Sequence, residues 1–400
     1  MKNIILFDKP EVRGNLLPIT FTRPIAAIRI GITTIREKWQ SYFHEDSFSY
    51  WTAEFLSPKF ATNATDDNYF IAGHIIPDKN LVNSIENLQP GEVLQTPDGY
   101  NIIAFRGTLN DFERQNQSKI ACYEGNFESI NWLYDIFSKN DEILKEDFKA
   151  ITTNRKSQPL SDTNTIIGEQ YFEDGTPKIF IEEGASVEGA FLNVTKGPIY
   201  IGKDCEIMEG SCIRAPFAAC EHSVVNMGCK IYGATTLGPY CKVGGELNNV
   251  VMLGYSNKAH DGFLGNAVIG EWCNLGAGCS ASNLKNDYTE IKLWNYPAHR
   301  FLRTGLQFCG LIMGDHSKAG VNSIFNTATV IGVGVNIHGT GFPRNFVPSF
   351  SEGSSAGFVD VSLTKFFAIA ERAMARRNVT LTDADKEIFQ NIFSFADNYK

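Results

Sequence analysis

The chain has 400 residues, of which 43% are hydrophobic, so it carries enough apolar material for more than one packed core. Its 45 acidic and 36 basic residues give a formal net charge of -9. This balance argues against binding nucleic acid through a basic face, although a local basic pocket for a phosphate group remains compatible with it. No apolar stretch approaches the roughly 18 residues of a membrane span, so we expect no membrane partner.

The beginning of the chain and its cysteines indicate the compartment. The first apolar run is short and ends at Asp8 and Lys9, so it lacks the apolar region of a signal peptide. The nine cysteines are spread along the chain without a CxxC pair, a distribution that favours reduced thiols. We therefore expect a cytoplasmic protein.

The first 150 residues mix short apolar runs with helical patterns, as an α/β domain does. The apolar runs predict strands at residues 4–7, 69–76 and 100–105. Apolar residues at helical spacing predict helices over residues 25–39 and 130–148.

From Ile179 onward an apolar residue recurs every six positions, and a glycine often follows it. The recurring residues are Ile181, Val187, Ile201, Ile207, Ile213, Ile231, Leu237, Val243, Ile269, Leu275, Ile312, Ile324 and Val330. A period of six is typical of hexapeptide repeats, in which short strands stack into a parallel β-helix and the recurring side chains face the interior.

The fifth position of each repeat also faces the interior, and small residues occupy most of these positions. They are Cys205, Ser211, Thr235, Cys241, Cys273, Cys279 and Ala328. Four cysteines thus have a packing role, and we expect none of them to be a nucleophile. The repeat is interrupted near residues 193–200, 246–268 and 281–311, where we expect loops that leave the scaffold and carry function.

These patterns divide the chain into three parts. Residues 1–160 form the α/β domain and end in a polar linker, residues 161–345 form the β-helix, and residues 346–400 form a C-terminal helical cap. A helix at this end would cover the unpaired edges of the last coil.

Residues 16–24 resemble the start of the sugar-nucleotide nucleotidyltransferases, which have a Gly-rich phosphate loop before a Leu-x-Pro-Leu-Thr segment. Here the segment reads Leu-Leu-Pro-Ile-Thr, but the preceding loop keeps a single glycine, Gly14. The family's metal-binding Gly-Asp pair falls on Gly73 and His74. The resemblance implies a Rossmann-like domain that binds a nucleotide through Arg13 and Arg23. It also implies UTP and Mg²⁺ as candidate ligands of this domain, with the metal ligands unassigned.

Residues 258–283 resemble the acetyltransferase half of the bacterial bifunctional glucosamine-1-phosphate N-acetyltransferase/UDP-N-acetylglucosamine pyrophosphorylase family. The closest likeness is to a variant with a shortened, degenerate N-terminal domain. The family reads Lys-Ala-Gly-His, an aromatic residue, Leu-Gly, a hexapeptide, Asn-Ile-Gly-Ala-Gly and a loop with an asparagine. This chain follows that order from Lys258 through His260 and Phe263 to Asn283, with one residue missing before the histidine.

The resemblance implies a left-handed β-helix, a homotrimer and acetyl transfer from acetyl-CoA to an amino sugar phosphate. His260 would be the general base, since an imidazole can take a proton from an attacking amine near neutral pH. Asn274 and Asn283 would hold the sugar or orient the imidazole. The acyl-CoA would lie along the backbone of Gly276, Ala277 and Gly278, with its phosphates near Arg344.

Two alternatives remain open. In the first, the chain is a sugar-1-phosphate nucleotidyltransferase whose β-helix serves only trimerisation and regulation. In the second, it is a non-catalytic protein that binds a sugar nucleotide. The family's sugar-phosphate arginine aligns with Tyr232, so the sugar phosphate has lost an expected partner.

Overall fold

The computed structural model describes residues 2–44, 46–115 and 119–399. It contains two compact units. The first comprises Met1–Ile28, Thr33–Trp132 and Asp383–Asn391, and the second comprises Arg29–Ile32, Leu133–Thr382 and Ile392–Lys400. The predicted domain boundaries at 160 and 345 stay predictions, because the compact units of a structure need not end at the same residues as its evolutionary domains.

The first unit is built on a six-stranded sheet in the order β2-β1-β3-β5-β4-β6. Its strands are β1 (Asn3–Phe7), β2 (Ser47–Trp51), β3 (Asn68–Ala72), β4 (Glu92–Gln95), β5 (Ile102–Gly107) and β6 (Lys119–Cys122). β1 runs parallel to β2 and β3, whereas β5 is antiparallel to β3 and β4. Every residue of β1 and β3 is buried, as expected for central strands of a sheet covered on both faces.

The helices of this unit are α1 (Pro10–Asn15), α2 (Ile35–Tyr42), α3 (Lys79–Glu86) and α4 (Leu109–Glu113), with shorter 3-10 turns at Ile19–Phe21, Ile25–Ala27 and Glu54–Leu56. The prediction of one helix over residues 25–39 is wrong for its first part. Gly31 adopts a φ of +70°, which interrupts a right-handed helix. The helix begins only after Thr34, which forms a capping box with Glu37.

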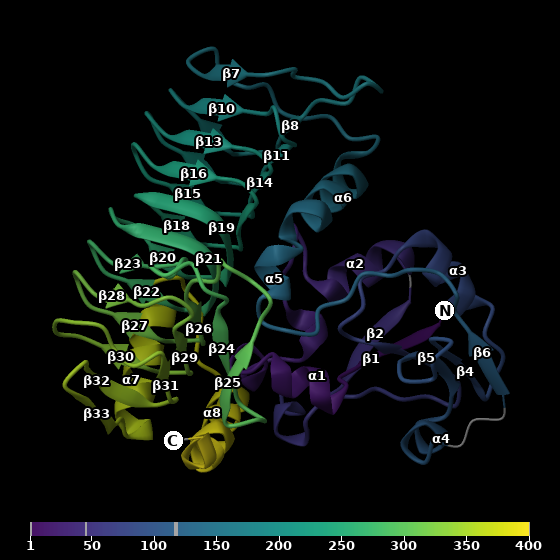
Figure 1. Cartoon of the computed structure of the whole chain (residues 1–400). Helices are drawn as coiled ribbons and strands as arrows, with labels where there is room; N and C mark the ends of the chain where they lie inside the picture. Colours follow the sequence, from purple (N-terminus) through teal and green to yellow (C-terminus); the bar gives the residue numbers. More distant parts are fainter. Residues whose placement is uncertain (1, 45, 116–118, 400) are drawn as a thin grey trace. The chain divides into compact units, whose positions relative to one another are not determined.

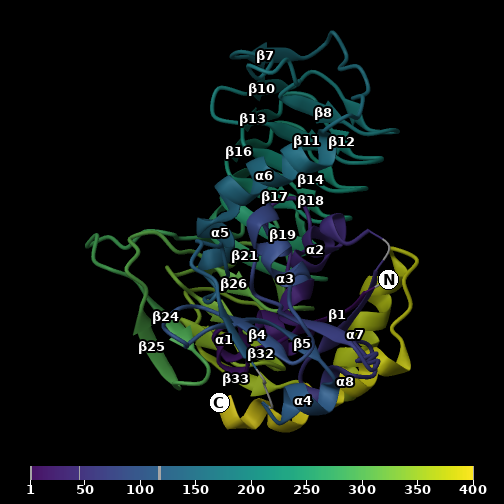
Figure 2. The ribbon, with the colours of Figure 1, turned by 90° about the vertical axis from the view of Figure 1, so that its right-hand side faces the viewer.

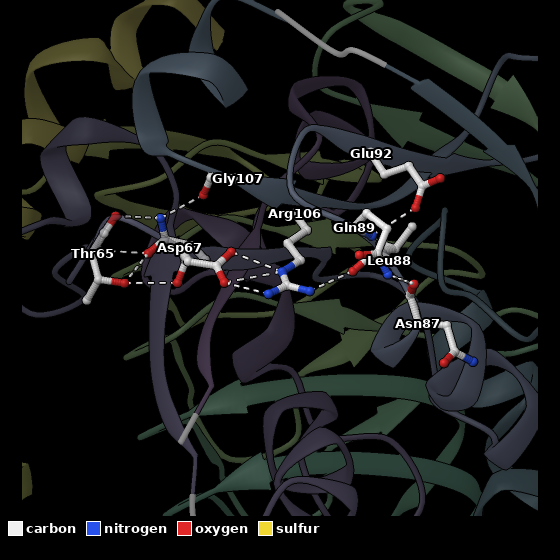
Figure 3. A network of polar contacts seen from close by, with 9 residues as sticks. Thr65, Asp67, Asn87, Leu88, Gln89, Glu92, Arg106 and Gly107 are labelled. Atoms are coloured by element: carbon white, nitrogen blue, oxygen red, sulfur yellow. Dashed lines mark hydrogen bonds and ion pairs between the residues drawn. The ribbon is translucent and has the colours of Figure 1, made fainter.

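Arg106 on β5 links the residue before β3 to the segment between α3 and β4. Its guanidinium binds Asp67 with Nε 3.0 Å from Oδ1 and Nη2 2.7 Å from Oδ2, and its Nη1 donates to the Leu88 carbonyl at 2.8 Å (Figure 3). Nearby, the Glu92 carboxylate accepts a hydrogen bond from the Gln89 N–H at 2.8 Å. Such multidentate, charge-assisted contacts fix the segments that connect β3, β4 and β5.

The second unit is a parallel β-helix, whose stacked coils are seen in Figures 1 and 2. Its described coils have three faces, which we call A, B and C. Face A contains β7 (Thr165–Ile167), β10 (Phe191–Asn193), β13 (Cys212–Arg214), β16 (Lys230–Tyr232), the first parts of β19 (Glu246–Gly254) and β21 (Phe263–Glu271), β23 (Ser280–Ala281) and β28 (Ile324–Phe325).

The other two faces follow the same parallel pairing, except that the last strand of face C is antiparallel to its neighbour. Face B contains β8 (Ile179–Ile181), β11 (Ile199–Ile201), β14 (Phe217–Ala219), β17 (Thr235–Leu237), the second parts of β19 and β21, β26 (Ile312–Met313), β29 (Val330–Ile331) and β31 (Phe346–Val347). Face C contains β9 (Ser186–Val187), β12 (Glu206–Ile207), β15 (Val224–Val225), β18 (Lys242–Val243), β20 (Asn257–Lys258), β22 (Asn274–Leu275), β27 (Lys318–Ala319), β30 (Asn336–Ile337), β32 (Ser351–Ser354) and β33 (Gly357–Asp360).

The six-residue period is confirmed, and so are the core positions of Cys205, Cys241, Cys273 and Cys279. Burial raises the pKa of the first three thiols to about 12, which makes them poor nucleophiles at neutral pH. Beyond the third interruption the predicted register is wrong by one residue, because two adjacent apolar residues fit the period equally well. The interior positions there are Met313, Phe325 and Ile331 in place of Ile312, Ile324 and Val330.

Residues 246–268 do not leave the scaffold, contrary to the prediction. They form β19, β20 and the start of β21, and the apparent break arises because the turn between β18 and β19 holds only Gly244 and Gly245. Residues 281–311 do form an excursion, which contains the antiparallel hairpin of β24 (Lys292–Asn295) and β25 (Arg300–Arg303).

A stack of aromatic rings follows the corner between faces B and C. Ring centroids are 4.6 Å apart for His222 and Tyr240, 5.1 Å for Tyr240 and Tyr255, and 4.2 Å for Tyr255 and Trp272. Each of these residues has a positive φ, so successive coils present the same backbone turn and stack their rings in register.

Four further helices complete the described chain: α5 (Asp135–Ser138), α6 (Asn140–Thr152), α7 (Leu363–Ala375) and α8 (Asp383–Ala396), the last followed by a 3-10 turn at Asp397–Tyr399. In the second unit, Phe366 of α7 packs edge-on against Phe350, with ring centroids 5.1 Å apart. The predicted fold class is confirmed: an α/β domain, a β-helix of parallel strands and C-terminal helices. None of the helices in the described ranges is long and apolar enough to cross a membrane.

Candidate functional site

His260 lies on the corner that joins β20 on face C to β21 on face A. The histidine is exposed, whereas hydrogen bonds from neighbouring coils hold the backbone of this corner. The carbonyl of Ala259 accepts from the Asn226 side chain at 2.7 Å, that of Asp261 from the Gly278 N–H at 3.0 Å, and that of Gly262 from the Glu246 N–H at 3.0 Å. The imidazole is therefore an exposed group on a fixed backbone.

Small residues form the neighbouring corners on both sides of His260. In the preceding coil the corner is Gly244 and Gly245, and a Cβ at Gly245 would lie 2.8 Å from the carbonyl oxygen of His260. In the following coil the corner contains Gly276, Ala277 and Gly278, which lie against residues 259–262 through the bond from Gly278 to Asp261. Close stacking of the coils requires these glycines, and no large side chain of either corner crowds the imidazole.

The predicted acyl-CoA segment is engaged in coil-to-coil hydrogen bonds. The Gly276 N–H donates to the Ala319 carbonyl at 2.9 Å, and the Gly278 N–H donates to the Asp261 carbonyl at 3.0 Å. Gly278 also has a φ of +73°, a conformation that favours glycine. These two N–H groups are thus occupied by the scaffold, and a role for the segment in binding acyl-CoA stays a prediction.

The two candidate asparagines lie on different faces. Asn274 is exposed on face C, where its backbone is in register with Asn257 and Lys318. Asn283 follows β23 on face A, and its Nδ2 donates to Oδ1 of Asn266 at 2.8 Å. Within the described ranges, no hydrogen bond joins either asparagine side chain to the imidazole of His260.

On the outer surface of face A, the ring of Phe263 and the amide of Asn283 meet over Gly265. Gly265 belongs to β21, the strand that begins three residues after His260. A Cβ at Gly265 would lie 2.6 Å from Cζ of Phe263 and 2.6 Å from Nδ2 of Asn283, so both side chains cover this glycine. The absence of a side chain at Gly265 brings Phe263 and Asn283 together. Arg344, the predicted partner of the CoA phosphates, is exposed just before β31.

In the first unit, the segment that aligns with the family's phosphate loop is helical. Residues Pro10–Asn15 form α1, with proline in the first turn. Arg13 donates to the carbonyl of Arg23 at 3.4 Å, and its guanidinium lies 3.6 Å from Asp8. Arg23 is only 4% exposed and donates to the carbonyl of Ile19 at 3.3 Å. Both arginines therefore contact the protein itself, and their contact with a nucleotide stays a prediction.

The side chains near the end of β1 and β3 do not fit a magnesium site of the family's kind. His74 stands where the carboxylate ligand would be, and burial lowers its pKa to about 3, so the imidazole is neutral at physiological pH. Burial also raises the pKa of Asp8, although Arg13 and Thr52 oppose this shift. Across the described ranges, no group of three or more His, Cys, Asp or Glu side chains is placed to hold a metal ion.

A cavity of about 260 Å³ lies at the carboxyl ends of β1 and β2, the edge at which open α/β sheets bind ligands. Its walls include the rings of Trp51, Phe105 and Phe112. Lys9 also lines it, with Nζ 3.0 Å from Oδ1 of Asn101, and burial lowers the pKa of this lysine. The carboxyl side chains of Asp8, Asp111 and Glu113 line the same cavity, so Lys9 lies among acidic as well as aromatic residues, and the aromatic walls suit a flat ring. The sequence did not point to this cavity, because its walls come from distant segments.

Comparison with known proteins agrees with this architecture. Residues 4–156 match the family described as sugar nucleotidyl transferase. The chain is 28% identical over 145 residues to the bifunctional sugar-1-phosphate nucleotidylyltransferase/acetyltransferase of Sulfurisphaera tokodaii, a match that covers 36% of each chain. It is 23% identical over 219 residues to the bifunctional protein GlmU of Synechococcus elongatus, which covers 51% of this chain and 44% of the relative.

The matched regions thus span between about a third and a half of the length of these curated relatives. The predicted resemblance is confirmed at this level. Residues 4–156 are similar to sugar nucleotidyl transferases, and the chain, which joins this region to a β-helix, is similar to bifunctional nucleotidylyltransferase/acetyltransferases.

Proposed function

We propose that the chain is an acetyl-CoA-dependent acetyltransferase that acts on an amino sugar phosphate of the glucosamine-1-phosphate kind. The observation that carries this proposal is the exposed His260 on a corner with a fixed backbone and glycine-rich neighbours. The similarity to a bifunctional nucleotidylyltransferase/acetyltransferase supports the same reaction class.

In this reaction the sugar amine attacks the carbonyl carbon of the thioester, and His260 takes the proton that the nitrogen loses as the C–N bond forms. The C–S bond then breaks, and the CoA sulfur leaves and is protonated to the free thiol. Phe263 and Asn283 border the sugar side of this site, and the corner of Gly276 to Gly278 borders the acyl-CoA side. Arg344 is the proposed partner of the CoA phosphates.

We further propose a homotrimer in which each site lies between two neighbouring β-helices, so that an isolated chain is inactive. The proposed location is the cytoplasm, which agrees with nine free cysteines. The first unit binds a UDP-sugar or UTP in the cavity beside Lys9. The helix α1 replaces the phosphate loop and His74 replaces the metal carboxylate, and both replacements argue against transfer of a nucleotidyl group.

Two assays test the two halves. The purified protein is incubated with acetyl-CoA and a panel of amino sugars and their 1-phosphates, and free thiol is measured. Thiol release with at least one of them is expected, and no release with any of them contradicts the acetyltransferase proposal. Release of pyrophosphate from UTP and N-acetylglucosamine-1-phosphate, measured in parallel with Mg²⁺, would show that the first unit is an active nucleotidyltransferase.

A further inference from the structure

On face C, the side chains that point into the β-helix stack in a column from coil to coil. A lysine interrupts this column. From β9 to β30 all the other residues of this column are aliphatic: Val187, Ile207, Val225, Val243, Leu275, Ala319 and Ile337. Lys258 occupies the position between Val243 and Leu275 and is only 1% exposed. Its ammonium group therefore lies inside the β-helix, next to the corner that carries His260.

The space for this ammonium comes from two unusual corners. In four other coils, the fourth residue after the column position is a small buried residue at the corner: Ser211, Cys229, Cys279 and Ser323. The coil of Lys258 has Gly262 at this place, and the preceding coil has only Gly244 and Gly245 before β19 begins. Two successive coils thus lack an inward corner side chain, and the end of Lys258 lies there.

The contacts of Lys258 are with backbone carbonyls. Its Nζ donates to the carbonyl of Gly244 at 3.2 Å and, through a shorter hydrogen bond, to the carbonyl of His260. Burial of an ammonium is costly, and here it lowers the pKa of the lysine. A methionine or leucine would fill the same column without this cost, so packing alone does not account for a lysine at this position.

We propose that Lys258 is a positioning residue that fixes the backbone of His260 from inside the β-helix. The carbonyls of Ala259, Asp261 and Gly262 are bound by the neighbouring coils, and Lys258 supplies the donor for the carbonyl of His260 itself. The imidazole then projects from a corner in which four successive carbonyls are bound. The catalytic consequence rests on the proposed acetyltransferase function, whereas the structural consequence does not.

The test compares Lys258→Met with a matched variant, Lys318→Met. Lys318 forms the same kind of clamp at the corner between faces B and C, where its Nζ donates to the carbonyls of Trp272 at 2.8 Å and His316 at 2.9 Å. We expect Lys258→Met to lower kcat about 100-fold with KM for acetyl-CoA within about twofold, as misplacement of a catalytic group does. Lys318→Met is expected to keep kcat within about threefold.

A second substitution separates positioning from general damage to the fold. Lys258→Gln keeps a side-chain N–H donor and is expected to recover kcat about tenfold relative to Lys258→Met. A folded Lys258→Met protein with the kcat of the wild type would overturn the proposal, as would equal losses of kcat in the Lys258 and Lys318 variants.

Hydrogen–deuterium exchange gives a readout that needs no activity. We expect exchange of the amides of residues 259–263 to rise at least about tenfold in Lys258→Met, and to stay at the wild-type rate in Lys318→Met. Unchanged exchange at this corner overturns the positioning role. If the wild type releases no thiol with any amino sugar but exchange rises as expected, the acetyltransferase proposal fails and the structural role of Lys258 stands.

Discussion

Asn283 donates a hydrogen bond from Nδ2 to Oδ1 of Asn266, one coil earlier, at 2.8 Å. With the Asn249 amide oriented to satisfy its neighbours, Nδ2 of Asn266 in turn lies 3.1 Å from the Asn249 oxygen. Asn249 and Asn266 both have a positive φ, which asparagine tolerates better than most residues. Asn283, a candidate substrate-binding residue, is thus the last member of a ladder of asparagines along the corner between faces A and B.

Substitution of Asn283 should therefore affect stability as well as any contact with substrate. We expect Asn283→Ala to lower the free energy of unfolding by about 1 kcal/mol, the usual net value of one hydrogen bond. Asn286→Ala, at an exposed position of the same loop, is the control and should leave the unfolding free energy unchanged. Urea unfolding of the three proteins measures this, and equal stability of all three would contradict the ladder.

The corner of His260 should not tolerate a side chain at Gly262. This glycine has a φ of +123°, and a Cβ there would overlap the carbonyl oxygen of Cys279. We expect Gly262→Ala to lower the midpoint of thermal unfolding well below that of Gly228→Ala. Gly228 has a φ of +68° at an equivalent corner but has open space around it, so its substitution introduces backbone strain alone. Similar midpoints for both variants would show that this corner can relax.

The stability of the second unit should rise with pH in the alkaline range because of Lys318. Burial lowers the pKa of this lysine to about 8, compared with about 10.4 in an unfolded chain. Between these values the unfolded chain binds more protons than the folded one, so the free energy of unfolding increases as the pH rises. Below pH 8 both states are protonated and the burial cost is fully present. Lys318→Met should flatten the rise between pH 8 and pH 10, as measured by urea unfolding.

The first unit should lose stability in acid because of His74. Its folded pKa of about 3 lies below the unfolded value of about 6.5, so the unfolded chain gains a proton that the folded chain does not. The stabilising effect of the neutral form is complete above pH 6.5 and is lost as the pH falls toward 3. We expect His74→Phe to reduce this loss, measured as hydrogen exchange in β3 between pH 7 and pH 5. An equal pH response in both proteins would contradict the assignment.

The sequence predicted the repeat well because apolar residues such as Ile207 and Leu275 recur at a clear period of six. It could not choose between Ile312 and Met313, since both are apolar and adjacent. It also could not reveal that Lys258 points inward, because a lysine in a repeat usually marks the outer surface. That orientation depends on the missing corner side chains of two coils, which only their stacking reveals.

The candidate site was predictable to a similar extent. The roles of His260 and Asn283 stay predictions that rest on the order of residues around them. The ladder from Asn283 to Asn266 was not predicted, because it joins residues 17 positions apart in sequence, in successive coils. In the first unit, a single glycine in the segment before Leu16 indicated a weakened phosphate loop. The helix α1 that replaces it was not predicted, because six residues are too few for a periodic pattern.

The most direct test of the central claim is the kcat of acetyl transfer in His260→Ala. Met227→Ala serves as the matched control, because Met227 is 70% exposed at the equivalent corner position two coils earlier. If His260 is the general base, kcat of His260→Ala should fall by about 10² to 10⁴, with an unfolding midpoint like that of the wild type. Met227→Ala should keep the wild-type rate. A His260→Ala protein that retains kcat within about threefold of the wild type would contradict the account.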